Sequence, residues 1–170
     1  YRDTPLPPRP LTEAEIHDFA AQVIALTNQE RAAYGLPPLA ANAALNTAAV
    51  RHSQDMATND FFSHTGSDGS SPGQRITQAG YVWYTYGENI AAGYTSPSSV
   101  VAAWMGSAGH RANILNHCFQ DMGVGYVYDE GDTYPGGTWG YTHYWTMDLG
   151  ARTYTCLTLT PTPTVTGAAA

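Results

Sequence analysis

The sequence predicts an α+β layered domain in which helices come first and antiparallel strands follow. Apolar residues recur at helical spacing in the first two thirds of the chain, and beyond Asp121 the spacing changes to two, as in "MGVGYVY". No Rossmann or barrel repeat accompanies this order. A length of 170 residues with 43% hydrophobic content is enough for one sizeable core and too short for two ordinary domains.

We therefore expect one folded domain over residues 12–159. Residues 1–11 contain four prolines, which favour an extended lead-in. Residues 160–170, "TPTPTVTGAAA", cannot bury apolar surface and are predicted to be a disordered tail or linker.

A capping box predicts the start of the first helix. Thr12 and Glu15 have the required spacing just before an apolar stripe that begins at Ile16. Gly35 should end this helix, because glycine suits the left-handed C-terminal cap and two prolines follow closely.

Caps and prolines predict the other helices. Asn42 caps a second helix that carries His52, which we interpret as a surface or packing histidine. Pro72 and Gly80 bracket a short third helix. Residues 95–97, "TSP", start a fourth helix, and "SAGHRANIL" follows it as a tight turn or short helix.

Loops and strands fill the remaining segments. Residues 61–71, "FFSHTGSDGSS", have loop composition, but their two phenylalanines should be buried and anchor the loop. "YVWYTY" over 81–86 is rich in strand formers. A long hairpin is predicted from "MGVGYVY" through "EGDTYPGG" to "TWGYTHYWTMDLG", and "TYTCLTLT" over 153–160 should supply a last strand.

The charge balance excludes one class of partner. Fourteen acidic residues against seven Lys plus Arg give a formal net charge of −7. Because the few basic residues are scattered, we expect no nucleic-acid partner. We also expect no transmembrane segment, since no apolar run has the required length. Low lysine content and the Thr/Pro tail favour a secreted, extracellular protein, which we expect to be a monomer.

Cys118 and Cys156 are the two cysteines of the chain. They are too few for a disulfide scaffold and lack the Cys-x-x-Cys spacing of a zinc or redox motif. Either both are buried free thiols, or they form one disulfide that ties the C-terminal strand to the region before it.

One acid and one histidine stand among small residues in segment 86–115. Glu88 lies in "YGENIAAG" and His110 in "GSAGHRANIL". A buried glutamate is costly unless a cation, a metal or several hydrogen-bond donors compensate. Histidine is a natural partner, because neutral imidazole binds divalent metals and its protonated form pairs with a carboxylate. The two groups are either isolated core residues or opposite walls of one site.

Five motifs occur in the order and approximate spacing of the CAP superfamily, which comprises cysteine-rich secretory proteins, antigen 5 and pathogenesis-related 1 proteins. The motifs are "FFSHTGSDG", "YGENIAAG", "WMGSAGHRANIL", "MGVGYVY" and "YWTMDLG". Over about Glu15 to Leu157 the chain resembles the bacterial-type, cysteine-poor branch. The resemblance implies a three-layer α-β-α sandwich with a central, mainly antiparallel sheet and a cleft lined by histidines and glutamates.

The resemblance also implies site residues. His64 of "FFSHTG" and Glu88 of "GEN" match the first cleft histidine and the first cleft glutamate of the family. His110 matches a histidine that is usual in the bacterial branch.

The chain departs from the eukaryotic pattern at the other two cleft positions. The second glutamate falls on Ser107, and the second histidine falls on Tyr144. The adjacent His143 should point to the opposite face of its strand unless a bulge intervenes. The fourth member of the cleft is therefore either His143 or Tyr144.

These residues predict a binding or effector module with a divalent metal, preferably zinc, held by His64, Glu88 and His110. Ser107 and Tyr144 would complete the ligand-binding cleft. The resemblance implies a small apolar ligand, such as a sterol or fatty acid, or an extracellular cell-surface protein as the partner.

Two alternatives to this function stay open. The first is a metal-dependent hydrolase in which Glu88 is the general base for a metal-bound water. A serine mechanism through Ser107 or Ser63 lacks a Gly-x-Ser-x-Gly elbow. The second is an interaction domain whose cleft groups only hydrogen-bond to one another.

Overall fold

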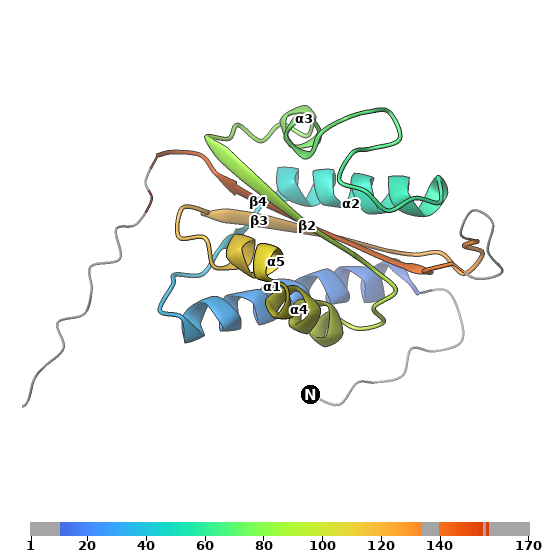
Figure 1. Cartoon of the computed structure of the whole chain (residues 1–170), viewed down its shortest axis with the longest axis horizontal. Helices are drawn as coiled ribbons and strands as arrows, with labels where there is room; N and C mark the ends of the chain where they lie inside the picture. The colour runs from blue at the N-terminus through green and yellow to red at the C-terminus, as the bar shows by residue number, and fades with distance from the viewer. Residues whose placement is uncertain (1–10, 134–139, 155, 157–170) are drawn as a thin grey trace, which may run out of the picture.

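A computed structural model of the chain describes residues 11–133, 140–154 and 156. Its helices and strands are labelled in Figure 1. In chain order they are α1 (Glu13–Ala33), β1 (Ala40–Ala41), α2 (Ala43–Thr58), α3 (Pro72–Gln78), β2 (Thr85–Ala92), α4 (Pro97–Gly106), α5 (Ala108–Ile114), β3 (Asp121–Tyr128) and β4 (His143–Ala151).

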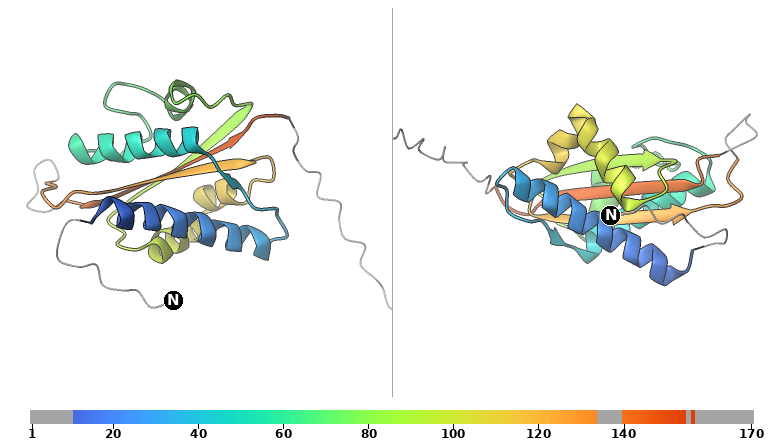
Figure 2. Two further views of the ribbon diagram at one scale, coloured as in Figure 1. Left: turned by 180° about the vertical axis from the view of Figure 1, so that it is seen from behind. Right: turned by 90° about the horizontal axis from the view of Figure 1, so that it is seen from below.

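In the described part of the chain the strands form one sheet in the order β1-β3-β4-β2. The long strands pair antiparallel, and the two-residue β1 runs parallel to β3. Helices α2 and α3 cover one face of the sheet, and α1, α4 and α5 cover the other (Figures 1 and 2). The predicted three-layer α-β-α sandwich with a mainly antiparallel sheet is therefore confirmed.

Side-chain caps fix where the helices begin. Thr12 accepts a bond from Glu15 N, and the Glu15 carboxylate accepts one from Thr12 N at 2.8 Å, as the capping box predicts. Asn42 caps α2 by accepting two backbone N–H bonds. The predicted starts of α3 at Pro72 and of α4 after Ser96 are confirmed.

Glycines follow the ends of two helices, as predicted. Gly35 has φ +72° and Gly80 has φ +96°, in the left-handed region that other residues rarely adopt. The segment "SAGHRANIL" forms the short helix α5 rather than an open turn.

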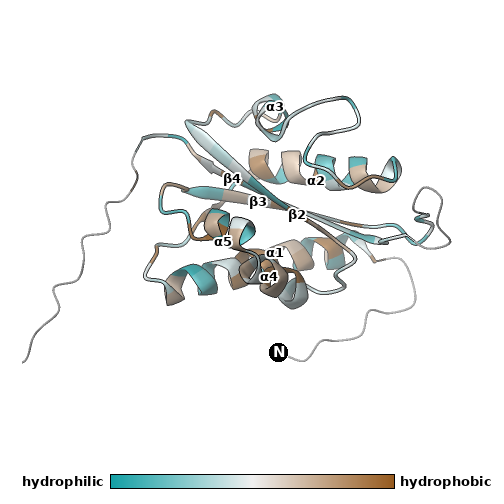
Figure 3. Cartoon of the chain, viewed as in Figure 1, coloured by the Kyte–Doolittle hydropathy of each residue, from teal (hydrophilic) through white to brown (hydrophobic). Residues whose placement is uncertain are grey.

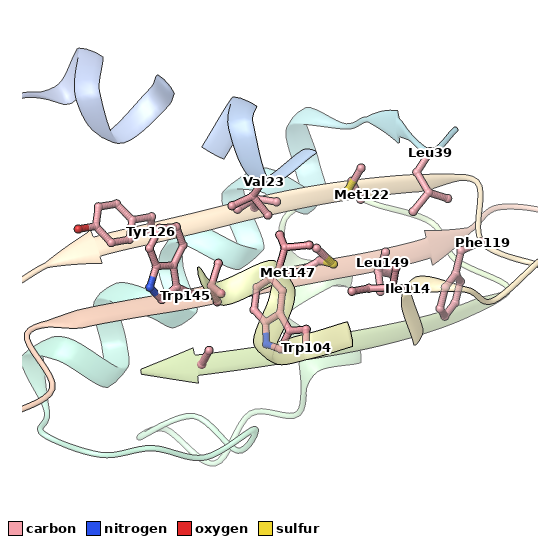
Figure 4. Packing of buried hydrophobic residues seen from close by; sticks show 14 of the residues in the cluster. Val23, Leu39, Trp104, Ile114, Phe119, Met122, Tyr126, Trp145, Met147 and Leu149 are labelled. Atoms are coloured by element: carbon pink, nitrogen blue, oxygen red, sulfur yellow. The ribbon is translucent and has the colours of Figure 1, made fainter. Parts of the chain in front are cut away.

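The larger hydrophobic core lies between the sheet and helices α1, α4 and α5 (Figure 4). Val23 of α1 and Trp104 of α4 pack there against Trp145, Met147 and Leu149 of β4. These three β4 residues share one face because side chains alternate along a strand. Helix α4 is coloured as hydrophobic over most of its length, in keeping with its burial (Figure 3).

On the opposite face, two glycines let α2 approach β3 closely. A Cβ atom at Gly123 or Gly125 would overlap backbone atoms of α2. The alternate residues of β4 point to this face. They are Tyr144, Thr146 and Asp148, of which Thr146 accepts a bond from Ser53 of α2 at 2.8 Å.

One predicted strand is wrong in its bounds, and the described start of another is a bend. β2 begins at Thr85 rather than at residue 81, and Val82 is 82% exposed. In the described residues β4 ends at Ala151, which pairs with Thr85. Residues 152–154 form a bend, and the rest of the predicted strand, except Cys156, lies outside the described residues.

The predicted burial of both phenylalanines in the 61–71 loop is also wrong. Phe62 is 44% exposed, while Phe61 is partly buried against α2. Phe62 lines an open cleft, described below, and therefore lacks a covering layer.

Cys118 and Cys156 form a disulfide, which decides between the two alternatives. Leu11 packs partly buried on the core, whereas residues 1–10 of the predicted lead-in and the whole predicted tail, 160–170, lie outside the described residues. Among the described helices, none combines the length and apolar character needed to cross a membrane.

Candidate functional site

Glu88 occupies the middle of β2, the edge strand, and its side chain is only 2% exposed. Its Oε1 lies 2.8 Å from Nδ1 of His64, and its Oε2 accepts a bond from Arg75 Nη2 at 2.8 Å. The sequence predicted that His64 and Glu88 meet, and the structure brings them together. The cation that a buried glutamate requires is Arg75, which sequence reasoning missed.

Arg75 also holds the loop that carries His64. Its guanidinium donates to the carbonyl oxygens of Ser70 and His64, each at 2.9 Å. Helix α3 thus places a buried positive charge beneath the 61–71 loop, and the His64 side chain remains 53% exposed above it. The histidine is therefore fixed at its backbone and at Nδ1 while its ring faces outward.

His52 of α2 is part of the same cluster. Its ring is fully buried, and Nε2 lies 2.8 Å from the carbonyl oxygen of Ser63 and 3.8 Å from Glu88 Oε1. Because a carbonyl only accepts, Nε2 carries the hydrogen and donates to it. Burial lowers the pKa of His52, although the charge of Glu88 acts in the opposite direction. His52 is thus a buried packing residue that anchors the loop, rather than a surface residue.

Asp148 lies directly opposite Glu88 in the β2–β4 register and is completely buried. Burial, together with the neighbouring charge of Glu88, raises the pKa of Asp148 well above its ordinary value. Neither oxygen of Asp148 accepts a hydrogen bond from a described group. A protonated Asp148 resolves this, because its hydroxyl can donate to the Glu88 carboxylate.

The charge state of Glu88 follows from these neighbours. Burial alone would raise its pKa, but the hydrogen bond with His64 and the charges of His52 and Arg75 outweigh burial and lower the pKa. Glu88 is therefore an ionised acceptor whose two oxygens are both engaged.

His110 lies on α5, which packs near β2. Its Nδ1 is 2.8 Å from Ser107 Oγ, and its carbonyl accepts a bond from Asn89 at 3.1 Å. Burial, and then the charge of His64, lower the pKa of His110.

A cleft of about 310 Å³ opens beside His110. Three aromatic residues, Phe62, Tyr94 and Tyr141, line it together with Ser107 and His110. Its inner side is formed by small or buried residues of β2 and α4, namely Ile90, Ala91, Ala92, Ala103 and Trp104. Ligand sites typically combine such an apolar lining with a few polar groups.

The structure separates the two candidates for the fourth cleft position. His143 is buried on the face of α1, where Tyr126 OH lies 2.8 Å from its Nδ1. Tyr144 shares the face of Glu88, but its hydroxyl donates to Asp132 at 2.7 Å, at the far end of the strand. The β2–β4 register runs without a bulge, so neither side chain joins His64 and Glu88.

The described residues contain one group of three potential metal ligands whose ligand atoms all lie within 4.8 Å of one another. This group is His117, Cys118 and Cys156, and its two sulfurs are bonded to each other. They therefore offer no thiolate to a metal. His64, Glu88 and His110 do not form such a compact group.

Sequence reasoning missed Arg75, His52 as a member of this cluster, and Asp148. Only Asp148 had a usable signal, because an acid inside the apolar strand "YWTMDLG" must be paired or neutral. Nothing in the spacing of Arg75 or His52 indicates that their helices converge on Glu88.

Comparison with known proteins gives a family and several relatives. The family model described as the cysteine-rich secretory protein family (CAP) matches residues 24–149. The uncharacterized protein YkwD of Bacillus subtilis (strain 168) is 42% identical over 114 residues, which make up 67% of this chain and 44% of that protein. The uncharacterized membrane protein YlbC of the same organism is 35% identical over 104 residues, 61% of this chain and 30% of that protein. The chain thus spans less than half the length of both relatives.

Two solved structures share the fold. An extracellular protein containing an SCP domain from Bacillus anthracis (strain Ames) superimposes with a TM-score of 0.70 and 29% identity, covering 84% of this chain and 45% of that one. An outer surface protein from Borrelia burgdorferi gives a TM-score of 0.71 at 19% identity, and the match covers 85% of this chain and 98% of that one. At that identity the second match shows the fold alone.

Proposed function

Since the chain belongs to the cysteine-rich secretory protein (CAP) family, we propose that it is an extracellular, non-enzymatic module that binds a divalent metal through His64 and His110 and a small ligand in the cleft beside His110. The extracellular assignment is supported by the disulfide and by the relative from Bacillus anthracis, which is described as extracellular. The folded domain of this module would be residues 12–159, as the sequence predicts.

The observation that carries the metal proposal is how the two histidines are held. Each is bonded through Nδ1, His64 to Glu88 and His110 to Ser107. In a neutral His64 that donates from Nδ1, Nε2 keeps its lone pair for a metal, as in the carboxylate–histidine–metal arrangement of many zinc sites. A bound zinc ion would supply a Lewis acid with open positions for a ligand.

The residues fit this role with one change to the predicted ligand set. Glu88 cannot become a direct ligand without giving up the bond to His64 or the ion pair with Arg75. Its place in the proposal is to orient His64 and to set its tautomer. The aromatic residues Phe62, Tyr94 and Tyr141 would then contact an apolar or ring-shaped part of the ligand beside His110.

Calorimetric titration of chelator-stripped protein with zinc tests the proposal. We expect one-site binding that is lost in the double variant His64→Ala/His110→Ala and weakened about 10- to 100-fold in Glu88→Gln. His117→Ala, outside the cleft, is the matched control and should bind as the wild type does. Failure of a folded wild type to bind zinc would overturn the metal proposal.

The geometry supports the hydrolase alternative less well. A general base needs a free oxygen and a pKa near the working pH. Both carboxylate oxygens of Glu88 are already hydrogen-bonded, and its pKa is lowered. Casein or ester hydrolysis that disappears with a chelator and in Glu88→Gln would contradict this conclusion.

A second groove favours an apolar ligand as an additional candidate function. About 640 Å³ of space lies between α1, α2 and β3, and apolar side chains dominate its lining, among them Ile16, Ile24, Val50 and Val124. This groove could accept the fatty acid or sterol that the family resemblance implies. Ala20→Trp should fill it and abolish saturable binding of a fluorescent fatty acid, while Ala32→Trp, on the same helix outside the groove, should leave binding unchanged. Binding that survives Ala20→Trp would exclude the groove.

A further inference from the structure

An open pocket of about 370 Å³ lies between α3 and the segment that leads into β2 (Figure 1). Two aromatic side chains and five small or polar residues of α3 and its cap line it, namely Trp83, Tyr86, Ser71, Gly73, Gln74, Thr77 and Gln78. None of these residues lines the cleft beside His110. The volume falls within the range of known ligand sites, about 300–1,000 Å³. The pocket is therefore a candidate site separate from the proposed metal cleft.

The two aromatic rings of this pocket are held in fixed positions. Trp83 and Tyr86 make an edge-to-face contact with centroids 4.7 Å apart, and Trp83 Nε1 donates to Thr77 Oγ1 at 3.0 Å. Gly73 lets both rings approach α3, because a Cβ atom there would lie 2.6 Å from Tyr86 Cε1 and 3.2 Å from Trp83 Cζ2. Trp83 nevertheless remains 37% exposed. It offers a ligand a rigid aromatic surface whose ring nitrogen is already bonded, so stacking on it costs little conformational entropy.

Two exposed glutamines of α3 present hydrogen-bond donors to the same pocket. The side-chain oxygen of Gln74 accepts a bond from Ser71 N at 2.8 Å, and that of Gln78 accepts one from Arg51 Nη1. Because both partners are donors, the orientation of each amide is fixed and its NH₂ group is the end left over. Within the described residues, neither NH₂ group has a hydrogen-bond partner. The hydroxyl of Thr77 accepts from Trp83 and keeps its own proton to donate.

The pocket thus combines an aromatic surface with donors and has no charged lining residue. The net charge of −7 further disfavours an anionic ligand. A sugar ring carries C–H groups on its faces, which pack on the negative face of an aromatic ring, and oxygen acceptors around its rim. We propose that the pocket binds one pyranose unit of a neutral saccharide, with its C–H face on Trp83 and its oxygens bonded by Gln74 and Gln78.

The exposed surroundings of the pocket fit a saccharide better than a purely apolar ligand. An apolar ligand would remove water from the two amide groups without offering them acceptors, which costs free energy. Gln74, Thr77 and Gln78 are exposed, so the neighbouring units of a longer saccharide have space beside the bound ring.

Saturation-transfer difference NMR on the full chain tests the site, with cellohexaose and chitohexaose as probes. Both are uncharged, and they are oligomers of glucose and of N-acetylglucosamine respectively. We expect saturation of ring C–H protons in at least one probe. Its affinity should fall about tenfold or more in Trp83→Ala, which removes the aromatic surface.

A second variant tests the donors without altering the aromatic rings. Gln74→Glu/Gln78→Glu keeps an acceptor for Ser71 N and for Arg51 but removes both NH₂ groups. We expect it to weaken saccharide binding by about tenfold. Unchanged affinity in this variant or in Trp83→Ala would overturn the proposal.

Two controls separate the pocket from other surfaces. Tyr34→Ala removes a ring that is 59% exposed at the C-terminal cap of α1, and it should bind the probe as the wild type does. His64→Ala/His110→Ala should also bind normally, so the result stands apart from the zinc proposal. An equal loss of affinity in Tyr34→Ala, or no saturation of either probe by folded wild type, would overturn the saccharide site. Co-sedimentation with phosphatidylcholine vesicles that Trp83→Ala abolishes, without saccharide binding, would instead identify a lipid-facing patch.

Discussion

Arg75 Nη2 lies 2.8 Å from Glu88 Oε2, and both side chains are 2% exposed. This ion pair joins α3 to the edge strand of the sheet beneath the loop that presents His64. Because Arg75 also donates to two carbonyls of that loop, the guanidinium compensates the buried charge and fixes the loop backbone at once.

Replacing Arg75 by methionine should destabilise the protein by about 3–5 kcal/mol, because Glu88 would keep a buried charge without its cation. Urea unfolding at neutral pH measures the difference. The matched control is Arg51→Met, which removes an exposed pair with Asp68 and should cost about 0–1 kcal/mol. Equal losses of unfolding free energy in the two variants would show that the buried ion pair contributes no more to stability than the exposed one.

Replacing Asp148 by asparagine should leave the protein at least as stable at neutral pH. The folded-state pKa of Asp148 is raised, so its contribution to stability is full below its unfolded pKa of about 4 and is lost as the pH rises through the folded value. Asparagine removes this loss and keeps a donor for Glu88. The advantage of the variant over the wild type should therefore shrink as the pH falls toward 4.

The contrasting variant is Asp148→Ala, which deletes the donor to Glu88 and leaves a cavity. We expect a loss of about 1–3 kcal/mol in the same unfolding measurements. If asparagine is as harmful as alanine, Asp148 is ionised in the folded protein and the assignment of its proton is wrong.

His143 should make the protein sensitive to mild acid. Burial lowers its pKa to about 4, whereas in the unfolded chain it takes up a proton near pH 6.5. Stability should therefore fall as the pH drops from about 6.5 toward 4, by up to about 3 kcal/mol for this residue alone.

The variant His143→Gln measures the pH-dependent contribution of His143 to stability. Glutamine can still accept a hydrogen bond from the Tyr126 hydroxyl, and it does not titrate. Its stability relative to the wild type should rise as the pH falls from about 6.5 to 4. Replacement of the exposed His17 by glutamine is the control, and a parallel pH dependence of all three proteins would refute the assignment.

The disulfide between Cys118 and Cys156 closes a loop with a sequence separation of 38. Loop-closure entropy of this length corresponds to roughly 3–4 kcal/mol of stability. Guanidinium unfolding of Cys118→Ser/Cys156→Ser should show this loss, and a thiol reductant should destabilise the wild type without affecting the variant. A stable, reductant-insensitive wild type would mean that the bridge contributes little.

The helix boundaries could be read from the sequence because their causes are local. The Thr12–Glu15 capping box, the Asn42 cap and the glycines at 35 and 80 act within a few residues of the backbone they satisfy. The layer order and the meeting of His64 with Glu88 came from motifs that resemble a known family, since spacing alone does not place two distant loops side by side.

Tertiary packing decided the rest of the site. The register of β2 against β4 set Asp148 opposite Glu88, turned His143 to the other face and carried Tyr144 to Asp132. The close approach of α2 over Gly123 and Gly125 brought His52 beneath the 61–71 loop.

Local sequence signals therefore predicted the helices, the alternation of the strands and the presence of an acid that needed a partner. Tertiary contacts were needed to show that the partner is Arg75, that Asp148 shares the burial of Glu88, and that the Tyr144 hydroxyl is bonded to Asp132. Charges and hydrogen bonds of this kind depend on distances between segments far apart in the chain. A shift of one residue in strand register would move every side chain of that strand to the opposite face of the sheet.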